Sequence, residues 1–335
     1  MSKFFIRNTA FGALMLAIFW VTGCKSNGTT ESKSLYITSE TSYDELRDAI
    51  FEAQEYNYFE RIFFDIYANH LDLDRRYKVG HYRVGGNLGI IETVRMFALG
   101  IQTPVNIVVS EARTIPQLAG KLSRQIEADS LSLVATFNDK ALRKELGYVQ
   151  DSLIAMIIPN TYEVYWTITP EQFLRRMKRE NEAFWTPSRQ QKLAATGLTR
   201  YEAMTLAAIV YEETKVRDEM PKIAGVYMNR LRKGMPLQAC PTVKYAMGDF
   251  ELRRILHKHL RYKSPFNTYI NKGLPPAPIC IPSIAAIDAV LNHERSGYLF
   301  FCARPEFDGK HNFARTLREH NANARRYAKA LEGSK

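Results

Sequence analysis

Residues 199–215 read Thr-Arg-Tyr-Glu-Ala-Met-Thr-Leu-Ala-Ala-Ile-Val-Tyr-Glu-Glu-Thr-Lys and carry the clearest fold signal in the chain. Thr199 and Glu202 have the spacing of a capping box, in which each side chain accepts a hydrogen bond from the other residue's backbone N–H. The apolar run that follows favours a helix through about Lys215.

One face of this predicted helix is apolar and ends in a carboxylate. At about 100° per residue, Glu213 falls on the same face as three apolar side chains, those of Leu206, Ile209 and Val210. Tyr211 and Glu212 point away from it. Because apolar surroundings disfavour the charged form, we expect a raised pKa for Glu213, as a general acid needs. A glutamate near a helix end can equally pair with Lys215 or Arg217, so helix geometry alone leaves both readings open.

The rest of the chain predicts an α+β fold with a helix-rich second half. We divide it into an export signal or anchor (1–24), a flexible tether (25–34), a first folded module (35–139) and a helix-rich domain (140–330). Proline, glycine and asparagine recur over residues 236–282, which predicts irregular structure and, at this length, a groove wall at a functional site.

The amino-terminus predicts export from the cytoplasm. Lys3 and Arg7 precede a largely apolar run, as in signal peptides. The end of that run, residues 21–24, resembles the lipobox of bacterial lipoproteins, with Cys24 as the lipidation candidate. A lipid anchor and an uncleaved membrane helix both remain open. Residues 25–34 contain no apolar side chain, which is typical of a tether.

Charge and cysteine content narrow the function classes. With 46 basic and 35 acidic side chains the net charge is +11, which favours a polyanionic partner or surface. The basic residues are scattered outside any recognisable nucleic-acid module, so we expect no nucleic acid partner. No spacing indicates a metal site or a cofactor loop, and His257 and His259 face different directions on a helix. A disulfide within the set Cys240, Cys280 and Cys302 stays open.

Further motifs follow the helix in a fixed order. They read Pro-Lys-Ile-Ala-Gly-Val-Tyr-Met-Asn-Arg-Leu at 221–231, Gly-Met-Pro-Leu-Gln-Ala-Cys-Pro-Thr-Val at 234–243, Ser-Pro-Phe-Asn-Thr-Tyr at 264–269, Gly-Leu-Pro-Pro-Ala-Pro-Ile at 273–279 and Glu-His-Asn at 319–321. Together with residues 206–214 they closely resemble the endolytic murein transglycosylase (YceG-like) family over most of residues 35–330.

The resemblance implies an enzyme that cleaves the MurNAc–GlcNAc bond in nascent peptidoglycan strands and leaves 1,6-anhydro-MurNAc ends. It also implies a LysM-like module between Ser34 and Leu99, attachment to the bacterial inner membrane with the body in the periplasm, and peptidoglycan synthases as partners. No cofactor is implied.

The resemblance places the catalytic acid in an Ile-Val-Glu-x-Glu-Thr segment. Here the first glutamate position is Tyr211 and the second is Glu213, so the family pattern and helix geometry agree on Glu213 as the catalytic residue. Cys240 stands where the family has aspartate, and Ala277 where it prefers glycine. Both changes leave the acid in place.

Five neutral hydrogen-bonding residues within the motifs suit the binding of sugar hydroxyl and N-acetyl groups: Asn229, Gln238, Thr242, Asn267 and Tyr269. A lytic transglycosylase needs one carboxylate, because the attacking hydroxyl belongs to the substrate, whereas hydrolysis needs two. A hydrolysing muramidase would use Asp249 or Glu251 as the second. A non-catalytic wall-binding scaffold is the alternative that Tyr211 and Cys240 favour.

Overall fold

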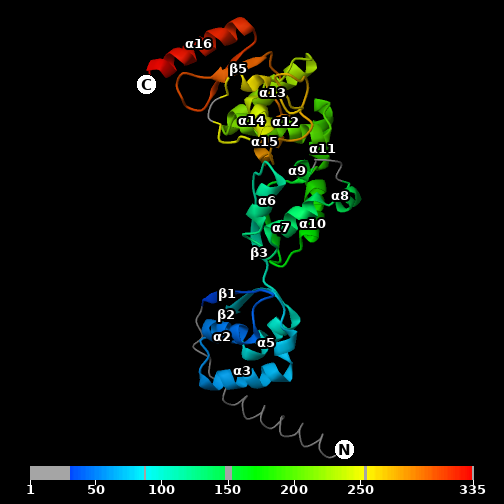
Figure 1. The fold of residues 1–335 in the computed structure, drawn as a ribbon, viewed down its shortest axis with the longest axis vertical. Coiled ribbons are helices and arrows are strands. Elements are labelled where there is room, and N and C mark those ends of the chain that lie inside the picture. The colour runs from blue at the N-terminus through cyan, green and yellow to red at the C-terminus, as the bar shows by residue number, and fades with distance from the viewer. Residues whose placement is uncertain (1–30, 87, 148–152, 253–254, 334–335) are drawn as a thin grey trace, which may run out of the picture. The chain divides into compact units, whose positions relative to one another are not determined.

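The computed structural model describes residues 31–86, 88–147, 153–252 and 255–333, and it confirms the α+β class (Figure 1). The chain packs as two compact units. The first lies within Met1–Val105 and includes Glu163–Thr167, and the second comprises Asn106–Tyr162 and Ile168–Lys335. Residues 106–139, which the sequence groups with the first module, therefore pack within the second unit.

The first unit has the order strand, helices, strand, helix. Its elements are β1 (Ser32–Ile37), α2 (Tyr43–Gln54), α3 (Tyr58–His70), α4 (Leu73–Arg76), β2 (Gly80–Gly85) and α5 (Ile90–Leu99). β1 and β2 are antiparallel, with Ser32 opposite Gly85. The last three residues of the expected tether, 32–34, are thus part of a paired strand.

The second unit consists mainly of helices. The elements from residue 105 onward are β3 (Val105–Val109), α6 (Ile115–Leu122), α7 (Ser130–Asn138), α8 (Lys140–Glu145), α9 (Leu153–Met156), β4 (Asn160–Val164), α10 (Pro170–Phe184), α11 (Pro187–Thr196), α12 (Arg200–Glu213), α13 (Met220–Arg232), α14 (Cys240–Met247), α15 (Ile284–Leu291), β5 (Phe300–Ala303), β6 (His311–Ala314) and α16 (Leu317–Gly333). Two three-residue 3-10 turns, Arg217–Glu219 and His259–Arg261, complete the set. Within 236–282, the described residues contain only α14 and the second of these turns.

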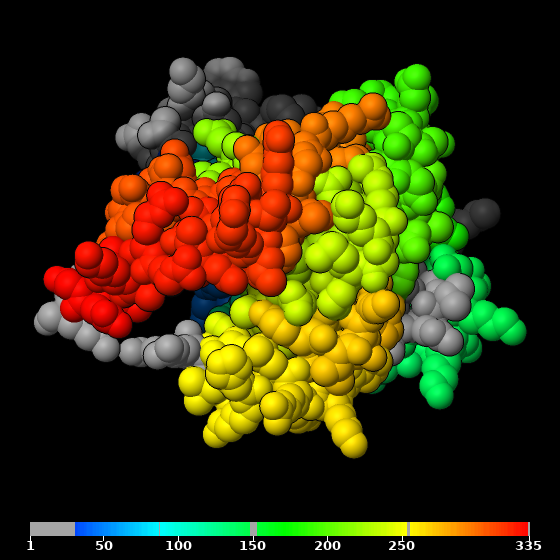
Figure 2. Space-filling view, turned by 90° about the horizontal axis from the view of Figure 1, so that it is seen from above, coloured from blue at the N-terminus to red at the C-terminus, as the bar shows by residue number. Residues whose placement is uncertain are grey.

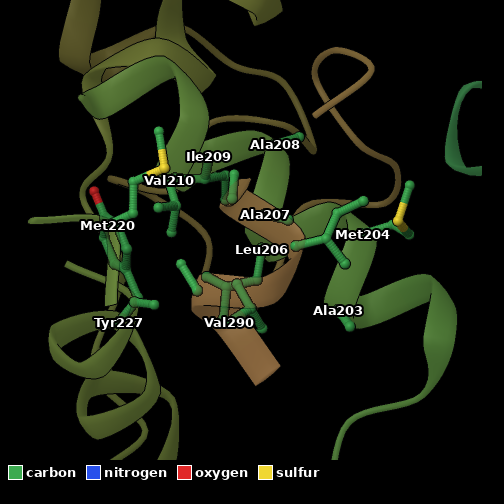
Figure 3. Close-up of a cluster of buried hydrophobic side chains, with 14 of the residues drawn as sticks. Ala203, Met204, Leu206, Ala207, Ala208, Ile209, Val210, Met220, Tyr227 and Val290 are labelled. Atoms are coloured by element: carbon green, nitrogen blue, oxygen red, sulfur yellow. The ribbon is translucent and has the colours of Figure 1, made fainter. Parts of the chain in front are cut away.

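Helix α12 is the centre of the second unit (Figure 3). Its predicted capping box is present: Glu202 N donates to Thr199 Oγ1, and Thr199 N donates to Glu202 Oε2 at 2.8 Å. All side chains from Ala203 to Val210 are buried against α9, α13, α14 and α15, so this part of the helix is buried on every side and not on one face alone. It ends at Glu213, two residues before Lys215, because Thr214 adopts an extended conformation.

Helix α13 packs closely against the segment that follows α15. At Gly225 a Cβ atom would lie 2.3 Å from the carbonyl oxygen of Glu294, so only glycine permits this approach. Asn229 Nδ2 donates to the carbonyl oxygens of Ser296 and Tyr298 at 2.7 and 2.9 Å. These contacts fix the position of α13 against the segment that follows α15.

Within the described residues, no helix combines the length and the apolar character that a membrane crossing requires. The predicted export signal and the lipidation candidate Cys24 lie outside the described residues. The three cysteines within them, Cys240, Cys280 and Cys302, are free thiols.

Candidate active site

A cavity of about 410 Å³ opens at the carboxyl end of α12, within the size range of ligand sites. One wall contains Glu213, Tyr227, Arg230, Gln238, Cys240 and Tyr269. A further group of lining residues comes from β5, β6 and α16: Phe300, Phe301, Cys302, His311 and His320. In Figure 2 the yellow segment that follows α14 and the orange-to-red carboxy-terminal segment occupy neighbouring parts of one face.

Glu213 is the last helical residue of α12 and part of the cavity wall. Burial raises its pKa to about 7, and the hydrogen bond from Tyr227 and the charge of Arg230 act in the opposite direction. Tyr227 Oη donates to Glu213 Oε1 at 2.8 Å. The partial negative charge at a helix carboxyl end also favours the protonated form. A carboxyl group with this pKa can both give and take a proton near neutral pH.

Arg230 holds the backbone beside the cavity in an unusual conformation. Its side chain is only 7% exposed and its Nη1 donates to the carbonyl oxygens of Leu237 and Pro236 at 2.7 and 3.3 Å and to Gln238 Oε1 at 3.4 Å. Gln238 has φ 53°, which costs a non-glycine residue about 1–3 kcal/mol. Backbone strain that the surroundings maintain is typical of functional sites, and Gln238 lines the cavity.

Tyr269 and Cys240 form a neutral pair in the same wall. Tyr269 Oη and Cys240 Sγ lie 3.2 Å apart. Burial raises the pKa of both groups, so both keep their protons near neutral pH. Tyr269 and Cys240, which stands where the family has aspartate, therefore both line the cavity.

The other three predicted binding residues are not part of the cavity wall. Asn229 binds the carbonyl oxygens after α15, as described above. Thr242 is fully buried, donates to the carbonyl oxygen of Ala239 and lies 2.9 Å from Thr268 Oγ1. Asn267 Nδ2 donates to two backbone carbonyl oxygens of residues 260–262, at 3.0 and 2.8 Å. The amide nitrogens of Asn229 and Asn267 and the hydroxyl group of Thr242 hold backbone in place.

Most of the remaining lining residues were not predicted from the sequence. Tyr227 and Arg230 carried a usable signal, since they are polar residues three apart on the buried face of α13. The aromatic and histidine wall carried none, because tertiary packing brings β5, β6 and α16 to the site. There His311 Nδ1 lies 2.9 Å from Glu219 Oε2, and the His320 ring stacks on Phe300.

The neighbouring Glu212 lies on another side of α12. It forms an ion pair with Arg113 at 2.8 Å. Tyr211 also turns away from the cavity and donates a hydrogen bond to Glu111. Of the two adjacent glutamates, only Glu213 lines the cavity.

Asp249 and Glu251, the candidates for a second carboxylate, are exposed and absent from the cavity wall. Glu213 is the one carboxyl group that the described residues contribute to it. Across the described ranges, no group of three or more His, Cys, Asp or Glu side chains is placed to hold a metal ion. Ala277 is buried and has no positive φ, so alanine fits where the family prefers glycine.

One proton-holding carboxyl group in a cavity is typical of an acid–base enzyme. The sequence pattern of the YceG-like family matches residues 35–326, and the chain belongs to this family. The family membership that the sequence motifs indicated is thereby confirmed.

Relatives and a solved structure agree with this assignment. An endolytic murein transglycosylase of Bacillus subtilis is 27% identical over 267 residues, 75% of this chain and 73% of the relative. One of Streptococcus pneumoniae is 28% identical over 291 residues, 78% of this chain and 52% of the relative, so the chain spans about half of that protein. A crystal structure of a YceG-like protein of Listeria monocytogenes superposes with a TM-score of 0.58 and 25% identity, covering 88% of this chain and 99% of that one. The names of the relatives bear out the prediction of a lytic-transglycosylase-type enzyme.

Proposed function

We propose that this chain is an endolytic murein transglycosylase that cuts peptidoglycan glycan strands with Glu213 as its single acid and base. The observation that carries the proposal is one carboxyl group in the cavity wall with a pKa of about 7. Such a group is protonated often enough to act as an acid and ionised often enough to act as a base at the same pH.

In the first step, Glu213 gives its proton to the glycosidic oxygen as the bond from that oxygen to MurNAc C1 breaks. In the second step, the MurNAc 6-hydroxyl attacks C1 and gives its proton to the Glu213 carboxylate, which restores the acid and leaves a 1,6-anhydro end. Because the nucleophile belongs to the substrate, the ring closure is intramolecular, which can supply up to about 7–11 kcal/mol in well-oriented systems. Water has no part in either step.

The neutral groups around Glu213 suit this chemistry. Gln238, Tyr269 and Cys240 can hydrogen-bond to sugar hydroxyl and N-acetyl groups without competing as nucleophiles, since the tyrosine and the thiol keep their protons. Phe300 and Phe301 of β5 offer apolar surface for a sugar ring in the same cavity. Substrate contacts by Gln238 and Tyr269 are part of the proposal.

The proposal extends to the first unit and to the surroundings of the enzyme. We assign a LysM-like, glycan-binding role to the first unit, supported by its order of one strand, three helices and a second strand and by the antiparallel β1–β2 pair. An anchor within residues 1–24, a periplasmic body and peptidoglycan synthases as partners follow from the export signal and the family membership.

The test is digestion of purified peptidoglycan by the chain and by Glu213→Gln, with mass analysis of the new glycan ends. Anhydro-MurNAc ends from the wild type alone support the proposal. Reducing ends would indicate a hydrolysing muramidase. Absence of cleavage on both nascent and mature strands would favour the wall-binding scaffold.

A further inference from the structure

Tyr227 is held in place by packing that is independent of any substrate. Its side chain is 1% exposed, and its ring packs edge-on against Phe301 with centroids 5.8 Å apart. Figure 3 shows it beside Val210 and Met220, where α13 meets the carboxyl end of α12. A hydroxyl group at the end of so constrained a ring has a fixed position.

This hydroxyl makes the two oxygens of Glu213 different. Oε1 accepts from Tyr227 Oη at 2.8 Å. Among the described residues, Oε2 of Glu213 has no hydrogen-bond partner. It is also not one of the fully buried polar atoms without a partner, so it is accessible from the cavity.

We propose that Tyr227 is the positioning residue of Glu213: by holding Oε1 it leaves Oε2 to give the proton to the glycosidic oxygen and to take one back from the attacking hydroxyl. This inference rests on the proposed function and names a residue that acts through Glu213, without contact to the reacting atoms.

The same hydrogen bond sets the charge state of the acid. A donor that binds the ionised carboxylate lowers its pKa, so Tyr227 opposes the effect of burial on Glu213. The other titratable or charged groups around Glu213 come from α12, α13, α14, the 264–269 segment, β5, β6 and α16: Glu212, Arg230, Cys240, Tyr269, Cys302, His311 and His320. Only Tyr227 donates a hydrogen bond to the carboxylate within the described residues.

The test compares the full chain with Tyr227→Phe, which keeps the buried ring and removes only the hydroxyl. We expect kcat to fall about tenfold with KM within a factor of two, because the acid loses its orientation and the substrate contacts stay. We also expect the alkaline limb of the pH profile to move up by about one pH unit, since a hydrogen bond to a charged group disappears.

A direct titration separates this inference from the proposed function. Infrared difference spectra against Glu213→Gln report the protonation of Glu213 whether or not the chain cleaves glycan. Tyr227→Phe should shift that titration upward by the same amount as the alkaline limb. If the wild type cleaves nothing, the infrared shift alone still supports or overturns the role of Tyr227.

Two further variants exclude a merely structural effect. Tyr162→Phe removes a similarly buried hydroxyl, which donates to the carbonyl oxygen of Ile158, and should leave both the pH profile and the Glu213 titration unchanged. Incorporation of 3-fluorotyrosine at position 227 keeps the hydroxyl but makes it a stronger donor, so the titration should move downward. An unchanged Glu213 titration in both position-227 variants would overturn the inference, even if the rate of Tyr227→Phe fell.

Discussion

At the carboxyl end of α12, two adjacent glutamates have different surroundings. Glu213 faces the cavity, where burial raises its pKa to about 7 and Tyr227 binds one of its oxygens. Glu212 faces Arg113 at 2.8 Å and Lys215 at 4.0 Å, so two cations compensate its charge. A rotation of about 100° along one helix thus separates an acid–base group from a structural ion pair. The surroundings, and not the residue type, decide which of the two can carry the chemistry.

Among substitutions beside the cavity, we expect Arg230→Met to cause the largest loss of stability and activity. It removes the donor to the carbonyl oxygens of Pro236 and Leu237 and to Gln238, so these groups lose their partner and the strained backbone loses its support. We expect about 3–5 kcal/mol lower stability and loss of nearly all activity. Urea unfolding and a cleavage assay measure both.

The control is Arg232→Met on the same helix, where the side chain is exposed and contacts His293. It should behave as the wild type. Equal losses in the two arginine variants would show that Arg230 has no special role in holding the cavity wall.

The second prediction concerns stability and pH. Glu213 has a pKa of about 7 in the folded chain against an ordinary value of 4.5, so the folded state binds its proton more tightly. The resulting stabilisation is complete below about pH 4.5 and is lost as pH rises through 7. Glu213→Gln has no such loss, so its stability relative to the wild type should rise by up to about 3 kcal/mol between pH 4.5 and pH 8. Parallel urea titrations at several pH values test this. A constant difference between the two proteins would contradict the raised pKa.

The third prediction restores the family's charge at position 240. In Cys240→Asp a second carboxylate faces the cavity, and the repulsion between like charges should raise the pKa of Glu213 further. The alkaline limb of the cleavage profile should then move to higher pH. Cys240→Asn, which has a similar shape and no charge, should leave the limb in place. An unchanged limb in Cys240→Asp would mean that the two carboxyl groups do not share one site.

We expect the smallest effect on stability and activity from a substitution on the side of α12 that faces away from the cavity. Tyr211→Phe removes the hydrogen bond to Glu111 but keeps the ring beneath the Lys215 ammonium. Stability should fall by about 1 kcal/mol or less, and activity should stay within a factor of two. A large loss of activity in cleavage assays would show that position 211 contributes to catalysis.

What the sequence predicted correctly was mostly local. The capping box at Thr199 depends on contacts within one helix, which residue spacing reveals. The residue at which α12 ends was harder to predict from the sequence, because the conformation of Thr214 depends on how the chain turns into the next helix.

Three of the predicted binding residues lie outside the cavity lining for a physical reason. Asn267 and Thr242 lie in or beside irregular backbone, where buried carbonyl and N–H groups need partners and amide or hydroxyl side chains supply them. Residue spacing alone cannot distinguish a side chain that binds the backbone from one that contacts a sugar. The wall formed by Phe300 and His320 depends on tertiary packing of the last elements, which no local pattern encodes.

The most direct test of the difference between the two glutamates is the rate of glycan cleavage by Glu213→Gln and Glu212→Gln, measured side by side with the wild type. We expect Glu213→Gln to lose at least about a thousandfold in rate, because no other carboxyl group of the described cavity wall can replace the acid. Glu212→Gln should keep most of the wild-type rate and form the same anhydro ends. Activity that survives in Glu213→Gln but is lost in Glu212→Gln would contradict the account.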